Sequence, residues 1–247
     1  MKIAILYFTY KNDWELLEQS LKALPMVEKT TEDELQVFIV DESCNPLPEI
    51  PDGVNYSQSC FDRQKNLNGV ECVEGMLNIY KSILEQGFDW LIKIDCDTVL
   101  NSVEWLRDKN NKLISQVGTS HKMPYNSGSC YAVSLAGVNA MLDRLQDPIV
   151  QIRANSAWME DRTICILSKM NYKMFCVQSV NDLNSINKNQ LYLDWMDDFS
   201  APLEQLEIPC AVAFKRCFAK SEADRWEQDR LNAIERMTKY VNYRLDK

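Results

Sequence analysis

Short apolar runs alternate with segments of helical periodicity along the first hundred residues, and this alternation limits the folds open to the chain. Strand-like runs occupy residues 2–9, 35–40, 54–60 and 88–94, and helical patterns occupy residues 14–24 and 66–86. Strands that alternate with helices in this way are typical of a largely parallel sheet flanked by helices. The sequence therefore predicts an α/β fold, with the first helix ending before Pro25.

The second half of the chain has a less regular pattern. We predict strands at residues 112–117, 129–134 and 173–177, helices at 135–145, 157–170 and 221–247, and a long loop at 178–209. No linker divides the chain, so we expect one domain over residues 1–247, in which residues 1–100 form a nucleotide-binding half and residues 101–220 an acceptor half.

Acidic residues directly follow two of the predicted strands. Asp41 comes after LQVFIV, and Asp95 and Asp97 come after WLIKI with one cysteine between them. In parallel sheets flanked by helices, ligands bind at the carboxyl ends of the strands. We therefore expect these carboxylates to lie at one edge of the sheet and to face one crevice.

Asp95 and Asp97 are candidate metal ligands. If the chain stays extended, their side chains point to the same side. Two carboxylates suit Mg²⁺ or Mn²⁺, which commonly take further oxygen ligands from a substrate phosphate. Aspartates are also common just after strands, so a loop with two solvated carboxylates is the alternative interpretation.

The strand followed by D-x-D, after an alternating N-terminal part, resembles a GT-A fold glycosyltransferase. The stretch VFIVDES resembles the second strand of the inverting family-two type. The stretches KIDCDTVLNSVEWL, YNSGSCYAVS and WMEDRTICILSKM resemble, in the same order, three segments of the fringe and core-galactosyltransferase group. The resemblance covers residues 1–177 and implies a mostly parallel central sheet, a nucleotide-sugar donor, expected to be a UDP-sugar, and a glycan or other hydroxyl acceptor.

The same resemblance implies a donor site around the metal. In the family the D-x-D motif holds a divalent cation, Mn²⁺ or Mg²⁺, against the diphosphate, which assigns the metal to Asp95 and Asp97. Asp41 is expected to contact the base or the ribose. The other residues expected at the nucleotide are Thr9 and Tyr10 beside the base, and Arg63 and Lys215 near the phosphates.

On the acceptor side, the resemblance makes Asp161 the base that deprotonates the acceptor hydroxyl. Its position at a predicted helix start favours the ionised carboxylate. The alternative is that Glu160 and Asp161 are ordinary acidic residues of a first helical turn, with no role in catalysis. The expected substrate-binding residues are Glu160, Gly128 and Ser129, where backbone passes close to a sugar, and Trp158, which offers a ring to a sugar face.

One departure from the fringe-like pattern concerns the third metal ligand. That group often supplies it from a C-terminal histidine, whereas the only histidine here is His121. Lys215, in AVAFKRC, occupies the equivalent place. A protonated lysine pairs with phosphate but does not bind a metal, so the cation would be held by aspartates, diphosphate and water.

The composition limits the kinds of partner that the chain is expected to bind and indicates its cellular compartment. The net charge of −9 gives no general basic surplus for nucleic acid. No apolar run reaches the roughly eighteen residues of a membrane span. The nine cysteines are scattered without a CxxC pair, which favours free thiols in a reducing compartment. We therefore predict a cytoplasmic protein that binds no nucleic acid and does not span a membrane.

Two other functions remain open at this stage. The stretch DCDTV also fits the motif of haloacid-dehalogenase-like phosphatases, in which the first aspartate is a nucleophile and the second an acid and base. Those proteins usually carry the motif on their first strand. The further residues that such an enzyme needs would be Ser179, Lys188 and the pair Asp197 and Asp198. The second alternative is an inactive transferase scaffold that only binds a nucleotide or glycan.

Overall fold

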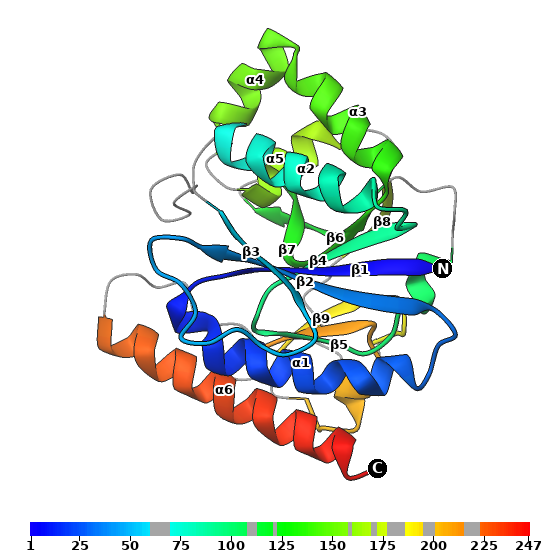
Figure 1. Ribbon diagram of the computed structural model, residues 1–247, viewed down its shortest axis with the longest axis vertical. Helices are drawn as coiled ribbons and strands as arrows, with labels where there is room; N and C mark the ends of the chain where they lie inside the picture. The colour runs from blue at the N-terminus through cyan, green and yellow to red at the C-terminus, as the bar shows by residue number, and fades with distance from the viewer. Residues whose placement is uncertain are drawn as a thin grey trace.

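A seven-stranded sheet forms the centre of the molecule (Figure 1). The computed structural model describes residues 1–59, 70–107, 113–120, 123–157, 160–168, 172–176, 186–194, 201–214 and 223–247. The strands of this sheet, in spatial order, are β3 (Asn55–Ser59), β2 (Glu34–Glu42), β1 (Lys2–Thr9), β4 (Trp90–Ile94), β7 (Met123–Val133), β6 (Leu113–Ser120) and β8 (Tyr172–Cys176).

One strand of this sheet, β7, runs opposite to the other six. Strands β3, β2, β1 and β4 are all parallel, and β7 runs antiparallel to both β4 and β6. The last strand, β8, is parallel to β6. Cys130 of β7 therefore lies beside Ile94 at the carboxyl end of β4, and residues from both halves of the chain meet there.

Helices cover both faces of the sheet. On one face lie α2 (Val70–Leu84), α3 (Leu135–Leu145), α4 (Pro148–Asn155) and α5 (Glu160–Leu167) (Figure 1). On the other face lie α1 (Trp14–Glu28), α6 (Ala223–Leu245) and a small sheet of β5 (Thr98–Leu100), β10 (Ala211–Ala213) and β9 (Leu191–Leu193). Short 3-10 turns precede α1 (η1, Lys11–Asp13) and occur at η2 (Glu104–Leu106) and η4 (Gln205–Glu207).

The alternation of side chains along β1 divides the core into two parts. Ile5 and Tyr7 pack with α1, α6 and the small sheet, whereas Leu6 and Phe8 pack with α2 and α3. Because both faces of the strand are covered, nearly every residue of β1 is buried and apolar. The continuous apolar run in the sequence predicts this central position correctly.

Several short elements differ from the sequence expectation. Helix α1 continues through Pro25 to Glu28, so its predicted end was wrong. Proline sits in the last turns, where the missing N–H affects one carbonyl only, and the Lys29 N–H still donates to the Pro25 carbonyl at 3.2 Å. The predicted loop 178–209 contains β9 and η4 in its described part, and α4 was not predicted at all. Strand β7 begins at Met123, earlier than predicted.

Two expectations of composition can be compared with the structure. Among the described residues, no helix is long and apolar enough to cross a membrane. The cysteines that the structure describes as free are buried Cys72, Cys96, Cys130, Cys165 and Cys210, together with exposed Cys44. The division into one domain stays a prediction.

Asn101, which follows β5, joins the C-terminal helix to the small sheet. Its side-chain amide donates to the carbonyls of Leu206 at 2.6 Å and Pro209 at 2.9 Å. Its oxygen accepts from the Tyr240 hydroxyl at 2.8 Å and from the Arg244 guanidinium at 2.7 Å. Since Asn101 is only 7% exposed, a shorter side chain would leave several buried polar groups unsatisfied.

We therefore expect Asn101→Ala to lower the free energy of unfolding by about 3 kcal/mol, as measured by urea denaturation. The control is Asn78→Ala, the same substitution at an exposed position of α2, which we expect to change stability by less than about 0.5 kcal/mol. Equal effects of the two substitutions would show that Asn101 does not hold α6 in place.

Candidate active site

The carboxyl ends of β1, β2 and β4 meet at one edge of the main sheet. Thr9 at the end of β1 pairs in register with Asp41 on β2. On β4, Ile94 pairs with Tyr7 on one side and with Cys130 on the other. The Asp95 N–H donates to the Ser129 carbonyl at 2.9 Å, which brings β7 to the same edge. Asp41, Asp95 and Ser129 therefore lie along one edge of the sheet, as expected from the sequence, and the crevice at this edge stays a prediction.

Asp95 and Asp97 lie on a tight turn that connects β4 to β5. The Thr98 N–H donates to the Asp95 carbonyl at 3.0 Å, so the chain is not extended here, and the geometric premise taken from the sequence was wrong. Cys96 between them is 4% exposed and packs in the core, whereas both aspartates are partly exposed. The buried Cys96 side chain fixes the turn to the core, and the carboxylates of the residues before and after Cys96 stay accessible to solvent.

The second aspartate is also anchored by its backbone. The Phe214 N–H donates to the Asp97 carbonyl at 2.7 Å, and the Thr98 hydroxyl lies 3.4 Å from Asp97 Oδ1. Phe214 is fully buried and directly follows β10. The position of the D-x-D turn therefore depends on the small sheet as well as on β4.

Lys93, a residue that sequence reasoning did not single out, contacts this turn. Its ammonium group donates to Asp95 Oδ1 at 2.6 Å and to the Gly128 carbonyl at 2.5 Å. It also lies 5.8 Å from the centre of the Tyr131 ring. The signal in the sequence is a lysine inside the apolar run WLIKI, two residues before Asp95 and hence on the same side of the strand.

The first turn of α5 lies against β7. A Cβ atom added at Gly128 would lie 3.6 Å from Asp161 Oδ2, so the carboxylate of Asp161 faces this glycine directly. The neighbouring Glu160 accepts a hydrogen bond from the Tyr131 hydroxyl at 3.1 Å. The structure thus brings the predicted acidic pair together with Gly128, at the edge where Asp95 lies.

The hydroxyl groups of Tyr80 and Tyr131 form a hydrogen-bonded chain that ends at Glu160. Their hydroxyl groups are 2.7 Å apart, and both side chains are fully buried. Burial raises the pKa of the Tyr131 hydroxyl well above its ordinary value, and the charge of Glu160 adds to this shift. Tyr131 therefore remains a neutral donor at any physiological pH and fixes the orientation of Glu160.

Asp41 is fully buried and already has several partners in the protein. Its Oδ1 accepts from the Thr9 hydroxyl at 2.7 Å, and its Oδ2 accepts from the Leu47 N–H at 2.8 Å and from the Tyr56 hydroxyl at 2.7 Å. These bonds hold the proline-containing loop after β2 against β1. Contact with a nucleotide base stays a prediction, and it would require one of these hydrogen bonds to be shared or exchanged.

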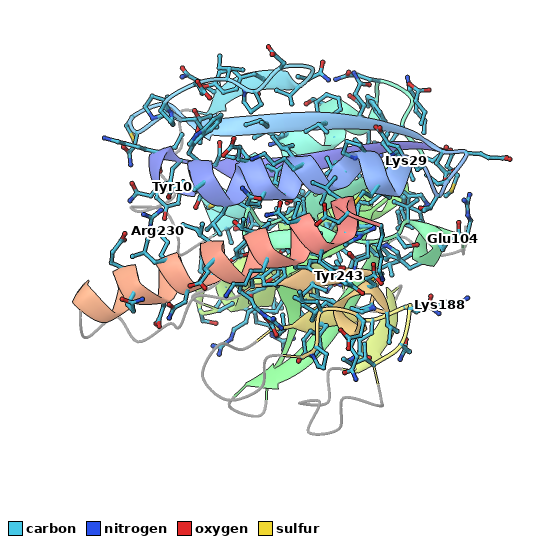
Figure 2. All side chains as sticks on the ribbon, turned by 90° about the horizontal axis from the view of Figure 1, so that it is seen from below. Tyr10, Lys29, Glu104, Lys188, Arg230 and Tyr243 are labelled. Atoms are coloured by element: carbon cyan, nitrogen blue, oxygen red, sulfur yellow. The ribbon has the colours of Figure 1, made fainter. Side chains whose placement is uncertain are left out.

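The structure describes only some of the remaining predicted residues. Tyr10 directly follows β1 and precedes η1. It lies near the N-terminal end of α1, close to Arg230 of α6 (Figure 2). Arg63, Trp158 and Lys215 lie outside the described residues, as do His121 and the phosphatase candidates Ser179, Asp197 and Asp198. Their roles stay predictions.

The donor atoms at the D-x-D turn fit a divalent cation. Asp95 and Asp97 offer carboxylate oxygens, the ligands that Mg²⁺ and Mn²⁺ prefer. Within the part of the chain that the structure describes, no group of three or more acidic, histidine or cysteine side chains is arranged to hold a metal. A cation here would have to take its other ligands from a substrate and from water.

Comparison with known proteins gives no match by sequence and clear matches by structure. No family model matches the chain, and no curated protein matches it by sequence. A crystal structure of a glycosyltransferase involved in glycosylation of the major capsid of PBCV-1 matches with a TM-score of 0.52 at 12% identity, covering 94% of this chain and all of that one.

The galactosyltransferase LgtC, solved with donor and acceptor sugar analogues, matches with the same TM-score of 0.52 at 13% identity, covering 97% of this chain and 95% of that one. At such identities the likeness concerns the fold alone. Together with the parallel strands that end at the D-x-D turn, these similarities show that the chain has the GT-A fold of nucleotide-sugar transferases.

Proposed function

We propose that the chain is a glycosyltransferase that moves a sugar from a nucleotide-sugar donor, a UDP-sugar, to an acceptor hydroxyl, with a divalent metal and with inversion at the anomeric carbon. The observation that carries this proposal is the approach of Asp161 to Gly128 at the same sheet edge as Asp95 and Asp97. Asp161, the candidate base, thus lies against Gly128 of β7. Asp95 and Asp97, the candidate metal ligands, follow the neighbouring strand β4.

The donor diphosphate would lie at the D-x-D turn. Asp95 and Asp97 would hold Mn²⁺ or Mg²⁺, and the bound cation supplies neutralisation of the negative charge on the departing diphosphate. The base would lie near Thr9, Tyr10 and Asp41 at the ends of β1 and β2. The remaining predicted phosphate contacts, from outside the described residues, are Arg63 and Lys215.

The chemical step needs one proton acceptor and one leaving group. Asp161 would take the proton of the acceptor hydroxyl while the hydroxyl oxygen forms a bond to the anomeric carbon. The bond between that carbon and the diphosphate oxygen breaks, and the diphosphate keeps the electron pair. Attack from the side opposite the leaving group inverts the configuration. The helix start at Glu160 favours the ionised form of Asp161 before the step.

The phosphatase alternative has less support. Its D-x-D-x-V motif normally lies on the first strand of the fold, whereas Asp95 follows the fourth strand of this chain. Two solved structures that resemble the chain over most of its length are glycosyltransferases. A scaffold that binds a nucleotide but performs no chemistry would have the same fold, and only turnover distinguishes it from an enzyme.

We expect Asp161→Asn to lower the turnover number about 10²- to 10⁴-fold, because the amide cannot accept the proton. The assay follows release of nucleoside diphosphate from a panel of UDP-sugars and GDP-sugars with Mn²⁺, with water or a supplied sugar as acceptor. The KM for the donor should change little, since Asp161 acts on the acceptor.

The matched control is Asp143→Asn, which removes the same charge from an exposed position of α3 and should leave turnover unchanged. Full activity in a folded Asp161→Asn variant would refute the assignment of the base. Failure of the wild-type chain to release diphosphate from any donor would favour the inactive scaffold.

We also expect Gly128→Ala to fold normally and yet to lose activity. The added methyl group would lie at ordinary contact distance from Asp161, so the variant should unfold within about 0.5 kcal/mol of the wild type. It would occupy the space through which an acceptor hydroxyl reaches Asp161, so turnover should fall at least about tenfold.

The control for Gly128→Ala is Gly87→Ala, at a glycine with φ of +94°. This substitution should cost about 1 kcal/mol of stability through backbone strain and leave turnover intact. Unchanged turnover in Gly128→Ala would mean that the acceptor does not approach Asp161 past β7.

A further inference from the structure

Lys93 is a charged side chain inside the core of the main sheet. Its side chain is 2% exposed, and the other residues of β4 are apolar and buried. A buried ammonium group is costly unless it is paired and hydrogen-bonded. The fold retains this lysine at the strand end, where a leucine or methionine would pack without that cost.

The partners of Lys93 connect the two sides of the candidate site. Asp95 Oδ1, at 2.6 Å, belongs to the D-x-D turn, and the Gly128 carbonyl, at 2.5 Å, belongs to the glycine that faces Asp161. The ammonium group therefore fixes one oxygen of Asp95 and the segment of β7 beside it.

The charge of Lys93 also affects how strongly the D-x-D turn attracts a cation. The ammonium group of Lys93, 2.6 Å from Asp95 Oδ1, offsets the negative charge of that carboxylate. The described residues contain no group of three or more metal-binding side chains. Lys93 would thus repel a divalent cation and weaken its attraction to Asp95 until a diphosphate adds its own charge and oxygens.

We propose that Lys93 is a positioning residue that acts as an internal counter-cation for Asp95 and makes divalent-cation binding depend on the nucleoside diphosphate. The inference rests on the proposed function, because it concerns the same metal site. In this role Lys93 prevents tight binding of free metal and keeps Asp95 oriented until the donor arrives.

The test measures Mn²⁺ binding by the loss of the free-ion electron paramagnetic resonance signal, with and without saturating UDP or GDP. The wild-type chain should bind Mn²⁺ weakly alone and about ten- to a hundredfold more tightly with one nucleotide. Lys93→Met, nearly equal in size and uncharged, should bind Mn²⁺ alone at least about tenfold more tightly than the wild type. The dependence on nucleotide should shrink accordingly.

Two further variants separate charge from packing. Lys93→Gln removes the charge but keeps a donor for Asp95, so it should also bind free Mn²⁺ more tightly and carries the test if Lys93→Met does not fold. Lys2→Met, which removes a lysine from the opposite end of β1, should leave Mn²⁺ binding unchanged. A merely structural role for Lys93 predicts weaker metal binding in its variants, never tighter.

The outcomes distinguish the inference from the proposed function. If the wild-type chain binds Mn²⁺ with nucleotide but folded Lys93 variants bind free Mn²⁺ no more tightly, the inference is wrong and the metal site stands. Tight Mn²⁺ binding by the wild-type chain without nucleotide also overturns the inference. If Mn²⁺ does not bind even with UDP or GDP, the metal site of the proposed function is wrong as well.

Discussion

Strand β4 lies between a parallel neighbour, β1, and an antiparallel neighbour, β7, and the candidate site depends on this placement. The parallel pairing puts the end of β4 beside the ends of β1 and β2. The antiparallel pairing brings Gly128 and Ser129 of β7 to the same edge, with α5 packed against them. Residues far apart in the sequence therefore meet where the D-x-D turn begins, as expected for ligand sites in open α/β sheets.

The polar groups at this edge are connected from the core outward. Tyr80 and Tyr131 are hydrogen-bonded inside the core, Tyr131 donates to Glu160, and Lys93 joins Asp95 to Gly128. Fully satisfied buried networks of this kind hold side chains in one arrangement. The described part of the site is thus built on strand ends and a helix start.

The sequence predicts the main elements of the fold for clear physical reasons, and it misses others for equally clear ones. β1 and α3 follow from long runs with one periodicity, whereas β5, β9 and β10 have three residues each and carry no readable period. The edge position of Asp95 follows from strand ends alone. The role of Lys93 depends on β7, a strand whose neighbour cannot be inferred from local pattern. The turn at Cys96 also needs tertiary contacts, because it is set by the core beneath β4 and by the bond from Phe214.

The central claim is that the edge formed by Asp95 and Asp97 binds a nucleoside diphosphate through a metal. The most direct measurement is calorimetric titration of UDP and GDP, with and without Mn²⁺, into the wild-type chain and into Asp97→Ala. The account predicts that one nucleotide binds only with Mn²⁺ and that Asp97→Ala abolishes this binding while the variant stays folded. Nucleotide binding that is independent of Mn²⁺ and unchanged in Asp97→Ala would contradict it.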